Sequence, residues 1–131
     1  MSQENVAVVQ RIVRAFCAGD WSAALNEYDE AVELDQSRMP DGGIYHGRHG
    51  MREFYVRWVG SWDHFDAQPL EFIDAGDATI VVMRISGTGK GSGASVTMRS
   101  ADLYTVGGGK VVRQIGYPDA SQAREAAGLS E

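Results

Sequence analysis

Three acidic residues in strand-like segments are the side chains of this chain best suited to chemistry. Glu33 and Asp35 alternate with apolar residues, so their carboxylates share one face of a strand predicted over residues 31–37. Asp102 lies in a second predicted strand. On a solvated face these groups would be ordinary surface charges. On a face that lines a cavity, burial would shift their pKa values and make them acid–base candidates.

A cavity shared by Asp35 and Asp102 would make both carboxyl groups acid–base candidates. Two carboxylates that face one apolar space cannot both ionise cheaply, so one should titrate well above its usual range. The alternation also places Met98, Ser100 and Tyr104 on the same face as Asp102.

Helices in the first half of the chain must position these strands. Apolar residues from Val6 to Phe16 form one face of a first helix that begins near Ser2 and ends at Gly19, and Asp20 is placed to cap a second. A third helix has the broadest apolar stripe, which consists of Met51, Phe54, Tyr55, Trp58, Val59 and Trp62.

The second half changes to the alternation typical of strands. We expect four of them, joined as antiparallel hairpins, and a tail helix capped by Asp119. Three helices followed by a meander predict an α+β fold, with one domain over residues 1–131 and helices on one side of a bent antiparallel sheet. The predicted strands cover residues 67–75, 79–87, 95–106 and 110–118.

Bulk properties exclude several classes of protein. The net charge of −6 argues against a nucleic-acid surface. No segment resembles a signal peptide or a membrane span, and the single cysteine, Cys17, fits a reducing compartment. Its apolar helical neighbours predict a buried thiol. We therefore expect a cytoplasmic protein that binds neither nucleic acid nor membranes.

Other motifs have ordinary explanations. GTGKGSG (residues 87–93) lacks the spacing of a phosphate loop and lies between strands, so it is expected to be a hairpin turn. His46 and His49 lack an evident third ligand, and His64 fits a loop. We expect no metal and no cofactor.

Several segments of the sequence match a known family. They are GGIYHGRHGMREF, EFIDAGDATIVVMR, GKGSG, GGKVVRQIGYPD and EAAGLSE (residues 42–54, 71–84, 89–93, 108–119 and 125–131). Through them the chain resembles the SnoaL-like branch of the nuclear transport factor 2-like superfamily, which includes ketosteroid isomerases and polyketide cyclases. This resemblance implies a cone-shaped barrel with a pocket at one end, commonly in a homodimer that pairs across the outer sheet face.

The resemblance to ketosteroid isomerases implies a general base at Asp35 and a second acid near Asp102, but their helix-one tyrosine corresponds to Ile12. The Arg and Asp pair of epoxide hydrolases would fall near Met83 and Ile85. The last-strand Asp of those enzymes and of the cyclases would fall at Gly116. The chain therefore departs from each catalytic pattern.

Two function classes remain open, and both use the same pocket. One is a binding or accessory domain for a small hydrophobic ligand. The other is a cofactor-independent isomerase, lyase or cyclase that acts on a small carbonyl compound through Asp35 and Asp102. A row with Ile80 and Val82 on the outer sheet face favours a homodimer. The ligand-binding candidates are Trp21, Tyr28, Glu33, Phe54, Trp58, Met83, Ile85, Tyr104, Gln114 and Gly116.

Overall fold

The computed structural model describes residues 2–40 and 42–129, which form helices and one sheet. In chain order the elements are α1 (Ser2–Cys17), α2 (Trp21–Leu25), β1 (Tyr28–Asp35), β2 (Ile44–His46), α3 (Gly47–Gly60), β3 (Trp62–Asp74), β4 (Ala78–Gly89), β5 (Ser95–Gly107), β6 (Lys110–Tyr117) and α4 (Ala120–Ala126).

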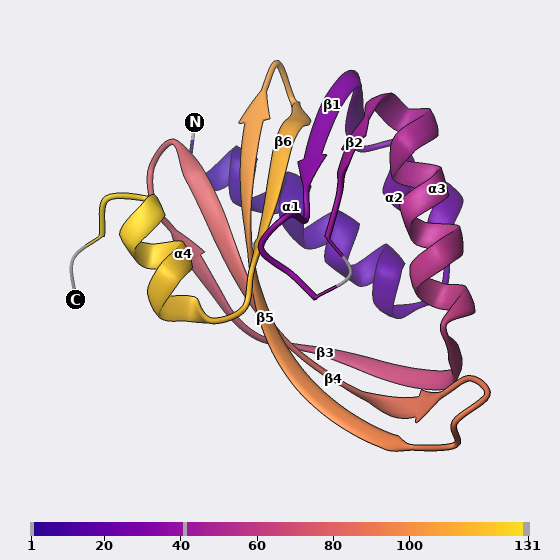
Figure 1. The fold of residues 1–131 in the computed structure, drawn as a ribbon. Helices are drawn as coiled ribbons and strands as arrows, with labels where there is room; N and C mark the ends of the chain where they lie inside the picture. The colour runs from indigo at the N-terminus through magenta and orange to yellow at the C-terminus, as the bar shows by residue number, and fades with distance from the viewer. Residues whose placement is uncertain (1, 41, 130–131) are drawn as a thin grey trace.

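The strands lie in the order β2-β1-β6-β5-β4-β3. Strands β3, β4 and β5 are long and bend, so the sheet curls around α1, α2 and α3 (Figure 1). This arrangement confirms the predicted α+β class with a bent sheet. The segment over residues 87–93 forms the end of β4 and the turn to β5, as its glycines indicated.

One strand pair differs from the expected antiparallel meander. Strands β1 and β6 run parallel, with Leu34 beside Gln114 and Asp35 beside Ile115. The reason is topological: β1 is separated from β6 by most of the chain, so no hairpin forces the pair to be antiparallel. This register decides which side chains of β1 face the helices.

The bend of the sheet has local causes in β3 and β4. Register shifts interrupt the β3–β4 ladder between Trp62 and His64 and between Pro69 and Glu71, and such irregularities bend a strand. Gly87 lies opposite Phe65, where an added Cβ would collide with the carbonyl oxygen of His64. A glycine here therefore permits the two backbones to approach closely.

Helix boundaries follow the capping residues in the sequence. The Asp20 carboxylate accepts a hydrogen bond from the Ala23 amide at 3.1 Å, and Asp119 accepts one from the Gln122 amide at 2.9 Å. Both predicted caps are confirmed. Helix α3 begins at Gly47, earlier than its apolar stripe, whereas Trp62 starts β3 instead of continuing the helix.

The main core lies between the sheet and the first three helices. Val9, Ile12 and Val13 of α1 pack there with Met51 of α3 and with Val32 and other residues of the sheet. Each helix contributes its apolar stripe, as expected for amphipathic helices on a sheet. The even-numbered residues at the end of β1 therefore face the helices.

A second, smaller core lies on the other face of the sheet. Helix α4 lies on that side (Figure 1), and Ala123 of α4 packs with Ile80, Val82 and Leu103. Ile80 and Val82 are therefore buried within the chain, and the prediction that they form an exposed apolar row was wrong. The hairpin spacing did not reveal that the tail helix folds back over them.

A homodimer through the outer sheet face stays a prediction, on a changed basis. Beyond α4, the outer face carries exposed Arg84 and Arg99, directly opposite each other. A dimer there would depend on polar contacts at its rim. We still expect a dimer by light scattering at micromolar concentration, and a monomer mass would contradict this expectation.

Cys17 lies at the end of α1 and is exposed, so the prediction of a buried thiol was wrong. The helix ends there, which leaves the side chain accessible to solvent. Partial burial still raises the pKa of the thiol, and the nearby charge of Asp66 adds to the rise. The thiolate form is thus disfavoured, which argues against a nucleophile.

Candidate functional site

A pocket lies between the inner sheet face and helices α1 and α3. Its empty volume, which includes the open mouth, is about 670 Å³. Its lining is mostly apolar with a few polar groups, a composition that suits a small organic ligand. The lining residues come from the helices, the sheet and the loop after β1: Ile12, Val13, Phe16, Tyr28, Gln36, Met39, Phe54, Tyr55, Trp58, Met83, Ile85, Met98, Ser100, Asp102, Tyr104 and Gln114.

Aromatic rings form much of the wall on the helical side. Phe16 of α1 contacts Tyr55 and Trp58 of α3, with ring centroids 5.8 and 5.6 Å apart. Phe65 of β3 meets Trp58 edge to face at 4.9 Å. These tilted contacts hold the rings in place and leave an apolar wall.

Asp102 is the single side chain of this lining that carries a carboxylate. It lies on β5 with Met98, Ser100 and Tyr104, which all line the pocket as the strand alternation predicted. Burial raises the pKa of Asp102 to about 6, and a hydrogen bond from Gln114 partly offsets the rise. Its remaining exposure is to the cavity, so the carboxyl group can change protonation near neutral pH.

A chain of polar side chains supports Asp102. The Gln114 Nε2 donates to Asp102 Oδ2 at 2.6 Å, and the Gln114 Oε1 accepts from the Tyr28 hydroxyl at 2.7 Å. The Tyr28 and Tyr55 hydroxyls lie 3.3 Å apart. These two hydrogen bonds orient the Gln114 side-chain amide so that its NH2 group faces Asp102.

The tyrosine hydroxyls of the pocket stay protonated. Burial raises the pKa of Tyr28 and Tyr104 well above the usual range, and it raises the pKa of Tyr55 to about 12. The neighbouring charge of Asp102 also raises all three. Ile12, which the resemblance aligned with a tyrosine, has no hydroxyl group, but the phenols of Tyr28, Tyr55 and Tyr104 therefore give the pocket neutral hydroxyl groups.

Gln114→Leu is expected to raise the pKa of Asp102 further. The variant removes a charge-assisted hydrogen bond, and such bonds contribute roughly 1.5–3 kcal/mol, or about one to two pKa units. It also leaves the buried Tyr28 hydroxyl without its acceptor. Titration of the Asp102 carboxyl carbon by NMR measures the effect.

Gln68→Leu is the matched control for this substitution. Gln68 is exposed and accepts a hydrogen bond from Arg84 on the outer face, away from the pocket. It should leave the Asp102 titration unchanged. An unaltered Asp102 pKa in Gln114→Leu itself would mean that the Gln114 hydrogen bond has no influence on the carboxylate.

Asp35 does not reach the pocket, and the prediction that it shares a cavity with Asp102 was wrong. Its parallel partner Ile115 belongs to the outer core, so Asp35 faces outward. The carboxylate accepts hydrogen bonds from the Ser37 hydroxyl at 2.6 Å and the Ser37 amide at 2.9 Å, and pairs with Arg38 at 3.2 Å. The bonds from Ser37, with the help of Arg38, lower the pKa of Asp35.

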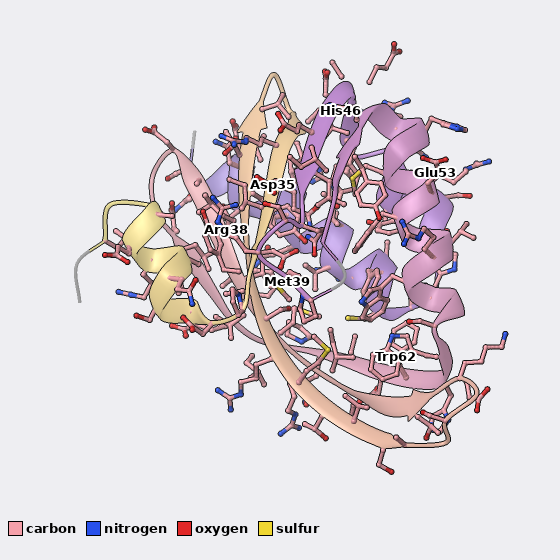
Figure 2. The ribbon with its side chains drawn as sticks, in the orientation of Figure 1. Asp35, Arg38, Met39, His46, Glu53 and Trp62 are labelled. Carbon is pink, nitrogen blue, oxygen red and sulfur yellow. The ribbon has the colours of Figure 1, made fainter. Side chains whose placement is uncertain are left out.

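Figure 2 shows Asp35 and Arg38 close together at the end of β1, with Met39 farther along the same loop. The Arg38 guanidinium lies 5.2 Å from the centre of the Tyr117 ring, which belongs to the outer core. Glu33 shares the outward face of Asp35, as alternation predicted, and it does not line the pocket. The pattern was right about the shared face, but that face is the outer one.

Gln36 takes the place that the sequence assigned to Asp35. It follows Leu34 on the inward side, and it lines the pocket. Strand alternation from the buried Val32 and Leu34 would have indicated it. The other lining residues absent from the prediction belong mainly to helix faces that the sequence assigned to the core.

Gly116 leaves room for Gln36. Gly116 is paired with Asp102 across β5 and β6, and a Cβ on it would lie 2.6 Å from the Gln36 Nε2. The Gln36 side chain thus occupies the space beside Asp102. Trp21 packs behind the wall, where its ring contacts Phe16 and Tyr55 at 5.2 and 6.0 Å. Neither Gly116 nor Trp21 contributes to the pocket lining.

Gly116→Ala is expected to move the Gln36 amide toward the cavity, because the new methyl group occupies its place. The side chain can rotate into open space, so the cost in stability should be about 1 kcal/mol or less. Affinity for an apolar probe should fall because the amide narrows the pocket. Gly60→Ala is the control, since a Cβ there meets nothing within 4 Å. Equal probe affinity in both variants would contradict this account of Gln36.

Within residues 2–40 and 42–129, no group of three His, Cys, Asp or Glu side chains is arranged to hold a metal ion. The exposed side chain of His49 on α3 lies near Glu53, with 4.0 Å between the His49 Nε2 and the Glu53 Oε2. In the same ranges, no helix is long and apolar enough to cross a membrane.

Most of the chain matches one known protein family. The model of the SnoaL-like domain matches residues 9–114. The chain belongs to the SnoaL-like domain family. This membership confirms the resemblance inferred from the sequence segments. A search of curated proteins found no match for this SnoaL-like domain.

Solved structures share the fold of this SnoaL-like domain. An NTF2-like protein from Burkholderia thailandensis E264 is 27% identical, with a TM-score of 0.79 over 92% of this chain and 95% of that one. TerC, co-crystallized with polyporic acid, is 21% identical, with a TM-score of 0.77 over 95% and 98%. A hypothetical protein from Catenulispora acidiphila DSM 44928, with a ketosteroid isomerase-like fold and in complex with trimethylamine, is 16% identical, with a TM-score of 0.74 over 94% and 93%.

Proposed function

We propose that this chain binds a small, mostly apolar organic molecule and that Asp102 is the polar group that meets it. The observation that carries the proposal is a single carboxylate set in an otherwise uncharged, aromatic-rich pocket. Pockets of this composition bind organic ligands through apolar contact, while a few polar groups orient them.

The polar side chains of the pocket converge on one region of its wall. Gln114 holds one carboxylate oxygen of Asp102, and Gln36 lies over Gly116, which pairs with Asp102. A ligand group placed there could meet a carboxylate, an amide and neutral phenols at once. The related folds whose structures contain polyporic acid and trimethylamine support the idea that this architecture accommodates small organic molecules.

Titration with the neutral fluorophore N-phenyl-1-naphthylamine tests the binding function. Its fluorescence should rise as it enters the apolar pocket of the wild type. Ser100→Phe fills space inside the pocket and should abolish this rise. Thr97→Phe is the matched control, because Thr97 is exposed on the same strand. Melting curves establish that both variants are folded.

Two outcomes would contradict the binding function. One is a fluorophore that does not bind the wild type. The other is an equal response from folded Ser100→Phe and Thr97→Phe, which would place the bound probe outside the pocket.

A second candidate function is a cofactor-independent isomerase, lyase or cyclase, favoured by the pKa of about 6 for Asp102. A base with a pKa near the working pH transfers protons efficiently. Because Asp35 faces outward, Asp102 alone would remove a proton from the carbon next to a carbonyl group and later return it. The C–H electron pair would form an enolate, and the Tyr55 hydroxyl, which donates to Tyr28 in this structure, would have to turn to donate to the enolate oxygen.

Deuterium exchange tests this second candidate. Cyclohexanone in deuterated buffer should lose its α-proton NMR signals faster with the wild type than with Asp102→Asn. Asp35→Asn should match the wild type, since its carboxylate lies outside the pocket. Equal rates with Asp102→Asn and with no protein would exclude this chemistry on simple ketones.

The cytoplasm remains the expected location, because the single cysteine fits a reducing compartment. Fractionation of cells that express the chain from its own gene tests this expectation.

A further inference from the structure

The charge of the pocket lining is uncompensated. Asp102 is its single carboxylic acid, and no Lys, Arg or His side chain belongs to the lining. Arg38, on the loop that follows β1, pairs with Asp35 on the outer side of the sheet. A buried charge without a partner is costly, so an arriving positive charge would interact with it strongly.

One oxygen of the carboxylate is free to make this interaction. Gln114 donates to Oδ2, whereas Oδ1 has no hydrogen-bond partner among the described residues. Among the described residues, the one fully buried side-chain polar atom that lacks a hydrogen-bond partner is the Trp62 Nε1. The Asp102 Oδ1, which also lacks a partner, is therefore not fully buried. A donor in the cavity can therefore reach Oδ1.

The rest of the lining also suits a positive charge. Aromatic rings reach the pocket from α1, α3, β1 and β5, and a cation near the face of such a ring is attracted to it. The rings are Phe16, Tyr28, Phe54, Tyr55, Trp58 and Tyr104. An anionic ligand would meet the Asp102 charge without a compensating cation in the lining.

We propose that the pocket selects organic ammonium cations: a protonated amine that contacts Asp102 and carries a compact apolar group held by the aromatic wall. This inference rests on the proposed binding function and names its ligand class. A neutral carbonyl ligand would instead need the protonated form of Asp102, and it would bind less well as pH rises.

The titratable groups that face Asp102 leave a clear pH signature. They are Tyr28 of β1, Tyr55 of α3 and Tyr104 of β5, with Cys17 of α1 near Tyr104, and each has a raised pKa. Between about pH 5 and 8, Asp102 is thus the one group of this set that changes charge. Ammonium affinity should follow its ionisation.

Three benzyl compounds of similar size test the proposal. Benzylamine is a cation at neutral pH, benzyl alcohol is neutral and benzoate is an anion. Competition against N-phenyl-1-naphthylamine should show benzylamine binding at least about tenfold more tightly than benzyl alcohol, as expected for a charge-assisted contact, with benzoate weakest. Lowering the pH from about 7.5 to 5 should weaken benzylamine roughly tenfold and leave benzyl alcohol unchanged.

Two variants show whether Asp102 causes the preference for benzylamine over benzyl alcohol. Asp102→Asn should remove the difference between benzylamine and benzyl alcohol, while Asp35→Asn should keep it. Equal affinities in the wild type, a preference for the alcohol or benzoate, or a benzylamine preference that survives Asp102→Asn would overturn the inference. If the fluorophore binds but benzylamine does not displace it, the cation inference fails and the binding function stands. If the fluorophore does not bind either, both fail.

Discussion

Asp102→Asn should make the folded chain more stable at neutral pH, although it removes the main polar group of the pocket. Burial raises the pKa of Asp102 from an ordinary 3.8 to about 6, which corresponds to at most about 3 kcal/mol of destabilisation when the group is ionised. Asp102 keeps some exposure to the cavity, so we expect a gain of about 2 kcal/mol.

The pH dependence of this gain has a definite sign. The folded state holds the Asp102 proton more tightly than the unfolded state, so wild-type stability falls as pH rises from about 4 to about 6. Asparagine does not titrate, so the difference between the two proteins should be near zero below about pH 4 and level off above about pH 6. Urea unfolding at several pH values measures it.

Asp35→Asn should show the opposite effect and is the matched control. The Ser37 hydrogen bonds lower the pKa of Asp35, so its charge stabilises the fold above the unfolded pKa and that contribution is lost as pH falls through the folded value. The variant should therefore be less stable than the wild type at neutral pH. A destabilised Asp102→Asn at neutral pH would contradict the buried-carboxylate account.

Trp58→Ala should cost about 2–3 kcal/mol of stability and widen the pocket. The Trp58 ring contacts Phe16 at 5.6 Å, Trp62 at 5.6 Å and Phe65 at 4.9 Å, so it joins α3 to α1 and β3. The sequence places Trp58 in the middle of an apolar stripe and predicts severe destabilisation, at the ~3–5 kcal/mol typical of buried aromatics. The structure leaves the ring half-buried at the pocket, which reduces the expected loss.

Val56→Ala tests whether this effect is specific to the inward face of α3. Val56 lies on the same helix but is 66% exposed, so its truncation should change stability by less than about 0.5 kcal/mol. Thermal and urea unfolding compare the two variants. Equal melting temperatures for Trp58→Ala and the wild type would show that the ring contacts contribute nothing to stability.

Helices and their ends could be recognised from short-range patterns. The residues of α1 that pack in the core recur at helical spacing, and Asp20 and Asp119 cap the helices that follow them. These features depend on interactions between residues a few positions apart. Similarly, the alternation around Asp102 correctly grouped Met98, Ser100 and Tyr104 on its face. The short strand β2 was missed, since three residues give no pattern.

Features that depend on residues far apart in the sequence could not be predicted from short-range patterns. Alternation grouped Glu33 with Asp35, but a strand has two equivalent faces until other elements pack on them. The parallel register with β6 placed Asp35 beside Ile115 of the outer core and turned Gln36 into the pocket. Helix α4 likewise buried Ile80 and Val82, although it follows them by many residues in the chain.

Short-range patterns were therefore sufficient to predict the α+β class and to find Asp102, whereas the family fold followed from the resemblance of several sequence segments to known relatives. The hydrogen-bond partner of Asp102 could not be predicted from such patterns. Whether it met Asp35 or Gln114 depended on long-range strand register, and its pKa depended on how much water the helices exclude from the finished pocket.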